Sequence, residues 1–424
     1  MRILILTQYY PPETGAPQSR LSDLAKRLAK FGHSVTVLTA LPNYPKGEIF
    51  EGYRGHTVIE EEIEGIRVIR TWIYVSKNKG FAQRLLNYFS FVFSSLTLGV
   101  WKVGRLDTVI VESPPLFLGL SGVFLSRLKR AQLVFNVSDL WPESAVAMGV
   151  LQNRTLIKLS KYLEEFLYRK AHLITGQTQG IVDNIQSRFP NKQVHLVTNG
   201  VDVEAFKLVS QISQREKIKK EFGNEERFVI GYAGLHGLAQ GLETVIQAAQ
   251  MLSGYPDLLF AFFGDGPEKE RLIRLANQVG STNVRFYPIQ RTARMPEVIA
   301  SFDIALIPLR KLDLFRGALP SKMFEAMAAA VPLVVSIEGE ARILVEKAQA
   351  GICVEPENPR AMADAILQLY RDPVRRRTLG QNGQRYVIKH YDRCQIARNF
   401  EYLIISGRRS DTSCAAATPE PPHA

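Results

Sequence analysis

Cysteine is scarce in this chain, and its scarcity argues against a cysteine-based metal or redox site. The three cysteines, Cys353, Cys394 and Cys414, are far apart and form no spacing typical of a metal or redox motif. This usage favours a reduced compartment. The first apolar run, residues 3–7, is too short for a signal peptide and instead predicts a first strand. No internal repeat is visible.

Acidic residues are fewer than basic ones, with 41 Asp and Glu against 53 Lys and Arg. The net charge is +12 and the pI is about 9.5, which favours acidic partners such as nucleotide phosphates, anionic lipid or nucleic acid. No nucleic-acid-binding signature accompanies the charge, so we expect no nucleic-acid partner. At 424 residues with 46% hydrophobic content, two domains with separate cores are expected.

Residues 71–106 contain no Asp or Glu at all. An apolar, aromatic-rich run at 85–101 is flanked by five cations: Lys77, Lys79, Arg84, Lys102 and Arg105. Its Asn, Ser and Thr residues argue against a spanning helix. The pattern fits a helix lying at a membrane surface, and it equally fits a buried core helix with solvated flanks.

The most informative stretch is 317–358. Pro320 and Ser321 predict a helix start with Ser321 as the cap, Pro332 ends the helix, and residues 333–336 predict a buried strand. A helix N-terminus carrying Lys322 is suited to bind an anion. Glu325, one turn further, is suited to accept hydrogen bonds from sugar hydroxyls. The alternative is an ordinary crossover helix with surface Lys and Glu.

Two loops in the first half of the chain follow predicted strands. Gly15 lies in a loop between the strand 3–7 and a helix ending near residue 30, where open α/β sheets bind ligands. A polar cluster at 138–143 follows the strand 132–137, and its Asp139 is a candidate to take a proton or position a hydroxyl. The alternatives are a plain turn at Gly15 and a helix N-cap at Asp139.

A glycine-rich loop also follows the strand starting at Phe228. Its Gly234 and Gly237 allow backbone amides to close around a diphosphate. Between them His236 is a candidate contact, although an ordinary loop residue is the simpler interpretation. Residues 264–268 predict a structural turn.

These motifs resemble glycosyltransferase family 4 over about residues 1–405. The family pattern P-S-K-x-x-E-A-x-A, a strand, G-E and a later G-x-x-V-x-P matches residues 320–356 in order and spacing. The N-G-V-D turn at 199–202 and the G-D-G-P turn at 264–267 also match. Within the family, the chain is similar to the colanic-acid and O-antigen group, which includes L-fucosamine and fucose transferases.

Four positions depart from the family pattern. Gly317 replaces a common Glu, Leu235 and Gln240 replace the usual Arg and Lys phosphate clamps, and Ser138 replaces a His. The single-Glu form also occurs in the family. The departures put the phosphate contacts in doubt and leave Lys322 as the main cation.

The resemblance implies an α/β fold of the GT-B type, with two Rossmann-like domains facing a central cleft. The expected divisions are an acceptor domain at 1–205, a nucleotide-sugar domain at 206–380, helices at 381–405 crossing back, and a disordered tail at 406–424. Motifs and resemblance together give a catalytic set and a donor-binding set. The catalytic candidates are Asp139, Lys322 and Glu325. The donor-binding candidates are Gly15, Gly234, His236, Gly237, Ile289, Arg294, Ser321, Lys322, Met323 and Glu325.

The implied activity is a retaining, metal-independent sugar transfer with no separate cofactor, because the nucleotide-diphosphate sugar is a co-substrate. The acceptor implied is a saccharide on a polyprenyl diphosphate, which places the protein in the cytoplasm on the inner face of the membrane. No nucleophile–base pair was found, which fits a reaction without a protein nucleophile. Two alternatives remain: a GT-B sugar-nucleotide 2-epimerase, and a nucleotide-sugar-binding subunit without catalysis.

Overall fold

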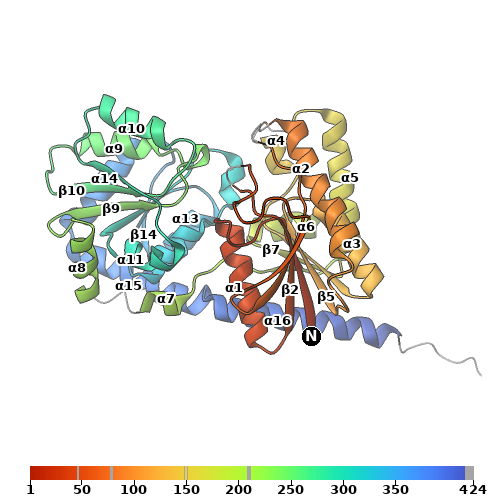
Figure 1. Ribbon diagram of the computed structural model, residues 1–424. Helices are drawn as coiled ribbons and strands as arrows, with labels where there is room; N and C mark the ends of the chain where they lie inside the picture. The colour runs from red at the N-terminus through yellow and green to blue at the C-terminus, as the bar shows by residue number, and fades with distance from the viewer. Residues whose placement is uncertain (45–46, 77–79, 148, 150, 208–211, 416–424) are drawn as a thin grey trace, which may run out of the picture. The chain divides into compact units, whose positions relative to one another are not determined.

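The protein is described here from a computed structural model, which covers residues 1–415 except 45–46, 77–79, 148, 150 and 208–211. The chain divides into two compact units (Figure 1). Unit 1 comprises residues 1–198 and 394–424, and unit 2 comprises residues 199–393. The observed division falls seven residues before the predicted boundary at 205/206 (205 − 198 = 7).

Unit 1 is built on an eight-stranded sheet. In spatial order its strands are β3 (Val58–Ile63), β4 (Ile66–Thr71), β2 (Ser34–Ala40), β1 (Arg2–Leu6), β5 (Thr108–Ser113), β6 (Gln132–Val137), β7 (Leu173–Gly176) and β8 (Val194–Leu196). Only the β3–β4 pair is antiparallel, and the two residues that join these strands, Glu64 and Gly65, form a connection of hairpin length. The central strands are almost continuously apolar because helices cover both faces of the sheet.

Seven α-helices and one π-helix accompany this sheet in the described part of unit 1. They are α1 (Ala16–Lys30), α2 (Phe81–Ser94), the π-helix η1 (Ser95–Gly99), α3 (Leu118–Lys129), α4 (Glu143–Ala147), α5 (Arg154–Lys170), α6 (Gln179–Arg188) and α16 (Arg393–Ala415). α16 packs Phe400 and Ile404 into the core beside β1 and α1. It continues to Ala415, so residues 406–415 of the tail predicted to be disordered are helical. This fits the absence of proline between the start of α16 and Pro419.

The acid-free segment is partly buried. Phe91 is fully buried in the core of unit 1, whereas Phe89, Phe93 and Trp101 are exposed. α2 is therefore amphipathic, which combines the two interpretations of this run. Among the described helices, none is long and apolar enough to cross a membrane.

Unit 2 contains a six-stranded, entirely parallel sheet. Its strands, in spatial order, are β11 (Val284–Tyr287), β10 (Leu258–Phe263), β9 (Phe228–Ala233), β12 (Ile304–Pro308), β13 (Leu333–Ser336) and β14 (Gly351–Cys353). The strand after Pro332 is fully buried, as predicted. Together with unit 1, this sheet confirms two Rossmann-like units.

The helices of unit 2 lie on both faces of its sheet (Figure 1). They are α7 (Val203–Lys207), α8 (Ile212–Glu221), η2 (Leu238–Gln240), α9 (Glu243–Met251), α10 (Lys269–Gln278), η3 (Thr292–Arg294), α11 (Met295–Ala300), η4 (Asp313–Gly317), α12 (Ser321–Ala328), α13 (Glu340–Ala348), α14 (Pro359–Arg371) and α15 (Pro373–His390). Of these, η2, η3 and η4 are 3₁₀ turns. The loop after β9 and the helix α12 carry most of the predicted site.

Candidate active site

Lys322 and the loop after β9 form the centre of the candidate site in unit 2. The Lys322 ammonium donates to the Tyr232 hydroxyl at 2.7 Å and lies 4.0 Å from the centre of its ring. The Tyr232 hydroxyl in turn donates to the backbone oxygen of Leu235 at 2.6 Å. Lys322 is thereby fixed beneath the glycine-rich loop. Tyr232 was missed by sequence reasoning because its position reads as an ordinary buried strand residue.

Gly234 is required by this geometry. Its φ of +144° lies in the region that favours glycine, and a Cβ there would stand 3.1 Å from the Lys322 ammonium. A side chain at 234 would therefore crowd the cation. Gly237 follows as the residue before the 3₁₀ turn η2, and its Cβ would meet the Gln240 side chain. Both predicted glycines lie in one loop with Lys322 below it.

The charge state of Lys322 is set by its surroundings. Burial lowers the pKa of Lys322 to about 7, and the nearby Glu325 carboxylate opposes that shift. Burial also raises the pKa of Glu325, against the effects of Arg393 and Lys322. For both side chains the effect of burial outweighs that of the nearby opposite charges. A cation of this kind gains its missing partner when an anion binds.

The start of α12 differs from the prediction in one respect. Pro320, not Ser321, occupies the cap position, and no side chain there accepts a hydrogen bond from the first turn. Ser321 is the first helical residue, because Pro320 adopts the extended conformation that the cap requires. The first backbone N–H groups of α12 thus have no side-chain cap, which leaves them available to an anion.

Two predicted donor contacts are core residues instead. Met323 is fully buried in the core cluster of unit 2, because it faces the sheet one position after Lys322. His236 is also fully buried, among Tyr232, Phe262 and Phe286. Neither side chain reaches the surface of the site, so direct donor contact by these two is a prediction that the structure does not support.

His236 has a structural role that the sequence did not reveal. Its backbone N–H donates to the Asp265 oxygen at 2.8 Å, and its own oxygen accepts from the Glu268 N–H at 3.0 Å. Burial lowers the pKa of His236 to about 4, with Lys269 and Lys322 adding to the effect. Both ring nitrogens lack a hydrogen-bond partner among the described residues. The residue joins the glycine-rich loop to the 264–268 turn, which fits the predicted structural role of that turn.

The remaining donor candidates in unit 2 are less directly placed. Ile289 follows β11 and is well exposed. Arg294 forms ion pairs with Glu221 at 2.5 Å and Glu297 at 2.9 Å, and these hydrogen bonds raise its pKa. Its guanidinium is therefore already committed to two carboxylates. Gly317 ends the turn η4, and the neighbouring Arg316 lies 3.8 Å from Glu338.

Unit 1 carries a buried polar cluster at the carboxyl ends of β5, β6 and β7. Glu112 accepts from Arg20 at 2.5 Å, from the Asn136 amide at 2.5 Å and from the Ser138 hydroxyl. Arg20 also donates to Ser138 at 2.9 Å. Arg20 and Glu112 are 92 positions apart, so no local motif pointed to them. We call Arg20, Glu112, Asn136 and Ser138 the Glu112 cluster.

Asp139 and Gly15 belong to the loops beside this cluster. Asp139 directly follows Ser138, and burial raises its pKa, against hydrogen bonds from Ser144 and the Leu140 backbone. Gly15 is exposed and immediately precedes α1, the helix that carries Arg20. The predicted Gly15 loop and polar cluster therefore do come from neighbouring strand ends, β1, β5 and β6.

Comparison with known proteins agrees with this geometry. The "Glycosyl transferase 4-like domain" model matches residues 15–200, and the "Glycosyl transferases group 1" model matches residues 213–386. Together they account for most of both units. The chain belongs to glycosyltransferase family 4. As a family 4 glycosyltransferase it has the GT-B fold that its sequence indicated.

Relatives and solved structures extend over most of this family 4 chain. It is 28% identical over 384 residues to the putative colanic acid biosynthesis glycosyl transferase WcaI of Escherichia coli, covering 87% of this chain and 92% of WcaI. It is 22% identical over 420 residues to the D-inositol 3-phosphate glycosyltransferase of Corynebacterium urealyticum, covering 92% of each.

Among solved structures, sucrose-phosphate synthase from Thermosynechococcus elongatus matches with a TM-score of 0.72 at 18% identity, covering 98% of this chain and all of that one. Anabaena Alr3699/HepE, solved in complex with UDP-glucose, matches with a TM-score of 0.71 at 19% identity, covering 96% of this chain and all of that one. At these identities the structural matches establish the fold alone.

Proposed function

We propose that this glycosyltransferase moves a sugar from a nucleotide-diphosphate sugar to a lipid-linked glycan acceptor during cell-surface polysaccharide synthesis. The observation that carries the donor half is Lys322, held by Tyr232 under Gly234 beside the uncapped start of α12. Support for the polysaccharide half is the similarity to WcaI, a putative colanic acid biosynthesis enzyme.

The chemistry proposed is stabilisation of a leaving diphosphate. As the bond between sugar and phosphate breaks, negative charge builds on the phosphate oxygens. Lys322 and the N–H groups at the start of α12 supply fixed positive potential for that charge. Glu325, one turn along α12, accepts hydrogen bonds from hydroxyls of the donor. Anomeric configuration is retained, with the departing phosphate assisting deprotonation of the acceptor hydroxyl, and no metal ion takes part.

The acceptor half of the proposal rests on unit 1. Its Gly15 loop and Asp139 border the Glu112 cluster, where polar groups converge at strand ends. Asp139 is proposed to position the acceptor hydroxyl. The basic, aromatic segment 77–105, which contains α2, is proposed to hold the protein on the inner face of the cytoplasmic membrane, near a lipid-linked acceptor. We call residues 77–105 the α2 segment.

A thermal-shift screen of UDP-, GDP- and dTDP-sugars tests the donor half. Ligands that bind only the folded protein raise its unfolding temperature. One nucleotide class is expected to stabilise the wild type, and Lys322→Gln is expected to abolish most of that shift. Product analysis by NMR then tests retention, and turnover in excess EDTA tests metal independence. If no nucleotide sugar shifts the transition, the proposed function is wrong.

The same assay addresses the two alternatives. A 2-epimerase would convert the donor in the absence of any acceptor, which NMR of the nucleotide sugar alone would reveal. An inactive binding subunit, suggested by Gly317, would show the thermal shift without turnover when supplied with a membrane extract containing acceptor lipids.

A further inference from the structure

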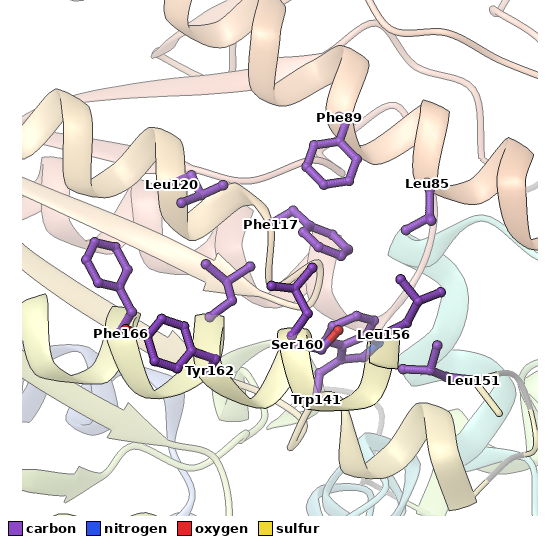
Figure 2. A pocket seen from close by; sticks show the side chains of 12 residues that line it. Leu85, Phe89, Phe117, Leu120, Trp141, Leu151, Leu156, Ser160, Tyr162 and Phe166 are labelled. Atoms are coloured by element: carbon purple, nitrogen blue, oxygen red, sulfur yellow. The ribbon is translucent and has the colours of Figure 1, made fainter. Parts of the chain in front are cut away.

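An apolar groove in unit 1 lies outside the candidate active site. Side chains from α2, the start of α3 and α5 point toward one another across a cavity of about 370 Å³ (Figure 2). Eleven of its twelve lining residues are aliphatic or aromatic, and the twelfth is Ser160. We call this cavity the α2–α5 groove. Its volume lies in the range of ordinary small-ligand sites.

The groove is open along its edges. Phe89, Leu159 and Tyr162 line it and yet are 44%, 63% and 71% exposed. Along α3 the apolar lining continues outward, because exposed Phe124 and Leu128 follow Leu120 at helical spacing. Soluble proteins rarely leave so many large apolar side chains together in water unless something covers them.

The helices that form the groove are basic, which favours an anionic molecule as its occupant. The three helices α2, α3 and α5 carry eight Lys or Arg residues (one, two and five) and only two Glu residues. Both carboxylates are already paired, Glu164 with Arg188 and Glu165 with Arg169. Lys158 and Lys161, by contrast, form no ion pair with any residue in the described part of the chain. The surface therefore favours an amphiphile with an anionic head.

The shape favours a hydrocarbon chain over a protein partner. A stable protein interface buries about 800 Å² on each partner over a broad face. Here the apolar surface is recessed between helices, and its lining is almost free of polar groups that a peptide backbone would need. A flexible hydrocarbon chain needs no hydrogen bonds and gains from every methylene that it buries.

We propose that the α2–α5 groove binds the hydrocarbon chain of the anionic lipid-linked acceptor. The proposal rests on the proposed function, in which the acceptor is lipid-linked, and adds that the protein recognises the lipid itself. Part of the lipid's hydrocarbon chain leaves the bilayer and lies between α2 and α5, while the cations of these helices lie near the phosphate head of the lipid. The enzyme then selects its acceptor by lipid as well as by sugar.

Binding of alkyl phosphates tests this directly. Butyl, octyl and dodecyl phosphate, each below its micelle concentration, are titrated into the full-length protein by calorimetry. Affinity is expected to rise by up to about fourfold for each methylene buried, and to level off once the groove is filled. Dodecyl phosphate binding no tighter than butyl phosphate binding would overturn the proposal.

A matched pair of variants locates the binding. The groove variant is Phe89→Ser, Leu159→Ser and Tyr162→Ser, all exposed enough to leave the fold intact. The control is Leu86→Ser, Leu196→Ser and Tyr402→Ser, which removes similar exposed side chains of unit 1 outside the groove. The groove variant is expected to bind dodecyl phosphate at least about tenfold more weakly, with butyl phosphate unchanged. The control is expected to behave as the wild type.

The outcomes separate this proposal from the proposed function. Equal dodecyl phosphate binding by the groove variant and the control would overturn the groove even if nucleotide sugars bind. Dodecyl phosphate binding in the groove with no nucleotide-sugar binding would support the groove and overturn the glycosyl-transfer proposal. A change in oligomeric mass by light scattering in the groove variant, with alkyl phosphate binding intact, would mean that a second copy covers the groove and would overturn its assignment to lipid.

Discussion

Lys322 is the main cation of the proposed donor site. The family resemblance places cationic clamps at positions 235 and 240, where this chain has Leu235 and Gln240, so we propose that the phosphate charge falls largely to the Lys322 ammonium. Burial holds the pKa of that ammonium at about 7, far below the usual value near 10.4 for lysine. Its charge in the free protein therefore changes within the physiological pH range.

The first prediction follows from this pKa. A bound diphosphate favours the charged ammonium and raises the pKa of Lys322, so donor binding above pH 7 takes up a proton. Donor affinity is then expected to be constant below pH 7 and to fall as pH rises, by at most about tenfold per unit. Calorimetric Kd values between pH 6 and 9 check this. Lys322→Arg, always charged, is the control and is expected to lose the dependence; an equally steep fall in that variant would contradict the assignment.

The second prediction concerns Glu325. Removing an acceptor from a desolvated polar contact costs about 1–3 kcal/mol, so Glu325→Ala is expected to weaken nucleotide-sugar binding by roughly tenfold. Burial raises the pKa of this carboxyl, and a thermal unfolding curve of the variant checks that it is folded. A folded variant with unchanged Kd and turnover would remove Glu325 from the site.

Sequence and structure agree at this scale where a local motif fixes the backbone. The proline before α12 and the glycines after β9 made Lys322, Glu325 and Gly234 recognisable in the sequence, and their roles in donor binding stay predictions. His236 and Met323 are buried, which the motif could not indicate because it specifies position along the chain, while burial depends on which way each side chain faces. Tyr232, which holds Lys322, was not predicted because its position in the sequence is that of an ordinary buried strand residue.

At the scale of elements, the Glu112 cluster ties helix α1 to the sheet. Arg20 comes from α1 and Glu112 from β5, and Asn136, from β6, accepts a hydrogen bond from Thr175 of β7 at 2.7 Å. The ion pair between Arg20 and Glu112 is almost fully buried, with side-chain exposures of 11% and 3%. A contact between residues so distant in sequence cannot be read from periodicity, which is why the sequence predicted the loops but not this cluster.

The third prediction tests the structural role of that pair. Breaking a buried ion pair by removing one charge costs about 3–5 kcal/mol, because the partner is left without compensation. Glu112→Gln is expected to lower the free energy of unfolding of unit 1 by a few kcal/mol, at most about this amount, as measured by urea denaturation. The double variant Glu112→Gln, Arg20→Met removes both charges and is expected to recover part of the loss. A single variant as stable as the wild type would show that the pair is not structurally important.

The α2 segment provides the fourth prediction. Arg84, Lys102 and Arg105 lie in the described part of the segment, and Lys77 and Lys79 lie outside it; Lys102 is paired with Glu60 at 2.9 Å. Each free cation near an anionic surface contributes about 1 kcal/mol. The wild type is expected to float with anionic liposomes and to be released by high salt.

Reversal of all five charges is expected to abolish flotation. Reversing five exposed cations of unit 2 instead provides the control for net charge, since the whole chain is basic. Of the aromatic residues in the run 85–101, we expect Phe89, Phe93 and Trp101, which are exposed, to contact the lipid. Phe91 takes no part in docking because it is buried in the core. A wild-type protein that stays in solution beside anionic liposomes at low salt would rule out docking.

At the scale of the whole molecule, length and composition predicted two domains, and the family resemblance added that both are α/β units. Apolar strands alternate with helices along the chain, which is the pattern of parallel sheets, and the two-residue turn between β3 and β4 accounts for the antiparallel pair. The crossing of α16 into unit 1 was anticipated from the family resemblance, not from the residues. The groove between α2, α3 and α5 was not anticipated, because it depends on three helices far apart in the chain.

The central claim is that unit 2 binds the nucleotide-diphosphate sugar around Lys322. Hydrogen–deuterium exchange, with and without the nucleotide sugar that gives the largest thermal shift, measures this most directly. The account predicts slower exchange in 232–238 and 320–326, and no such protection in the Lys322→Gln variant at the same ligand concentration. Protection confined to unit 1, or equal protection of the variant, would contradict the account.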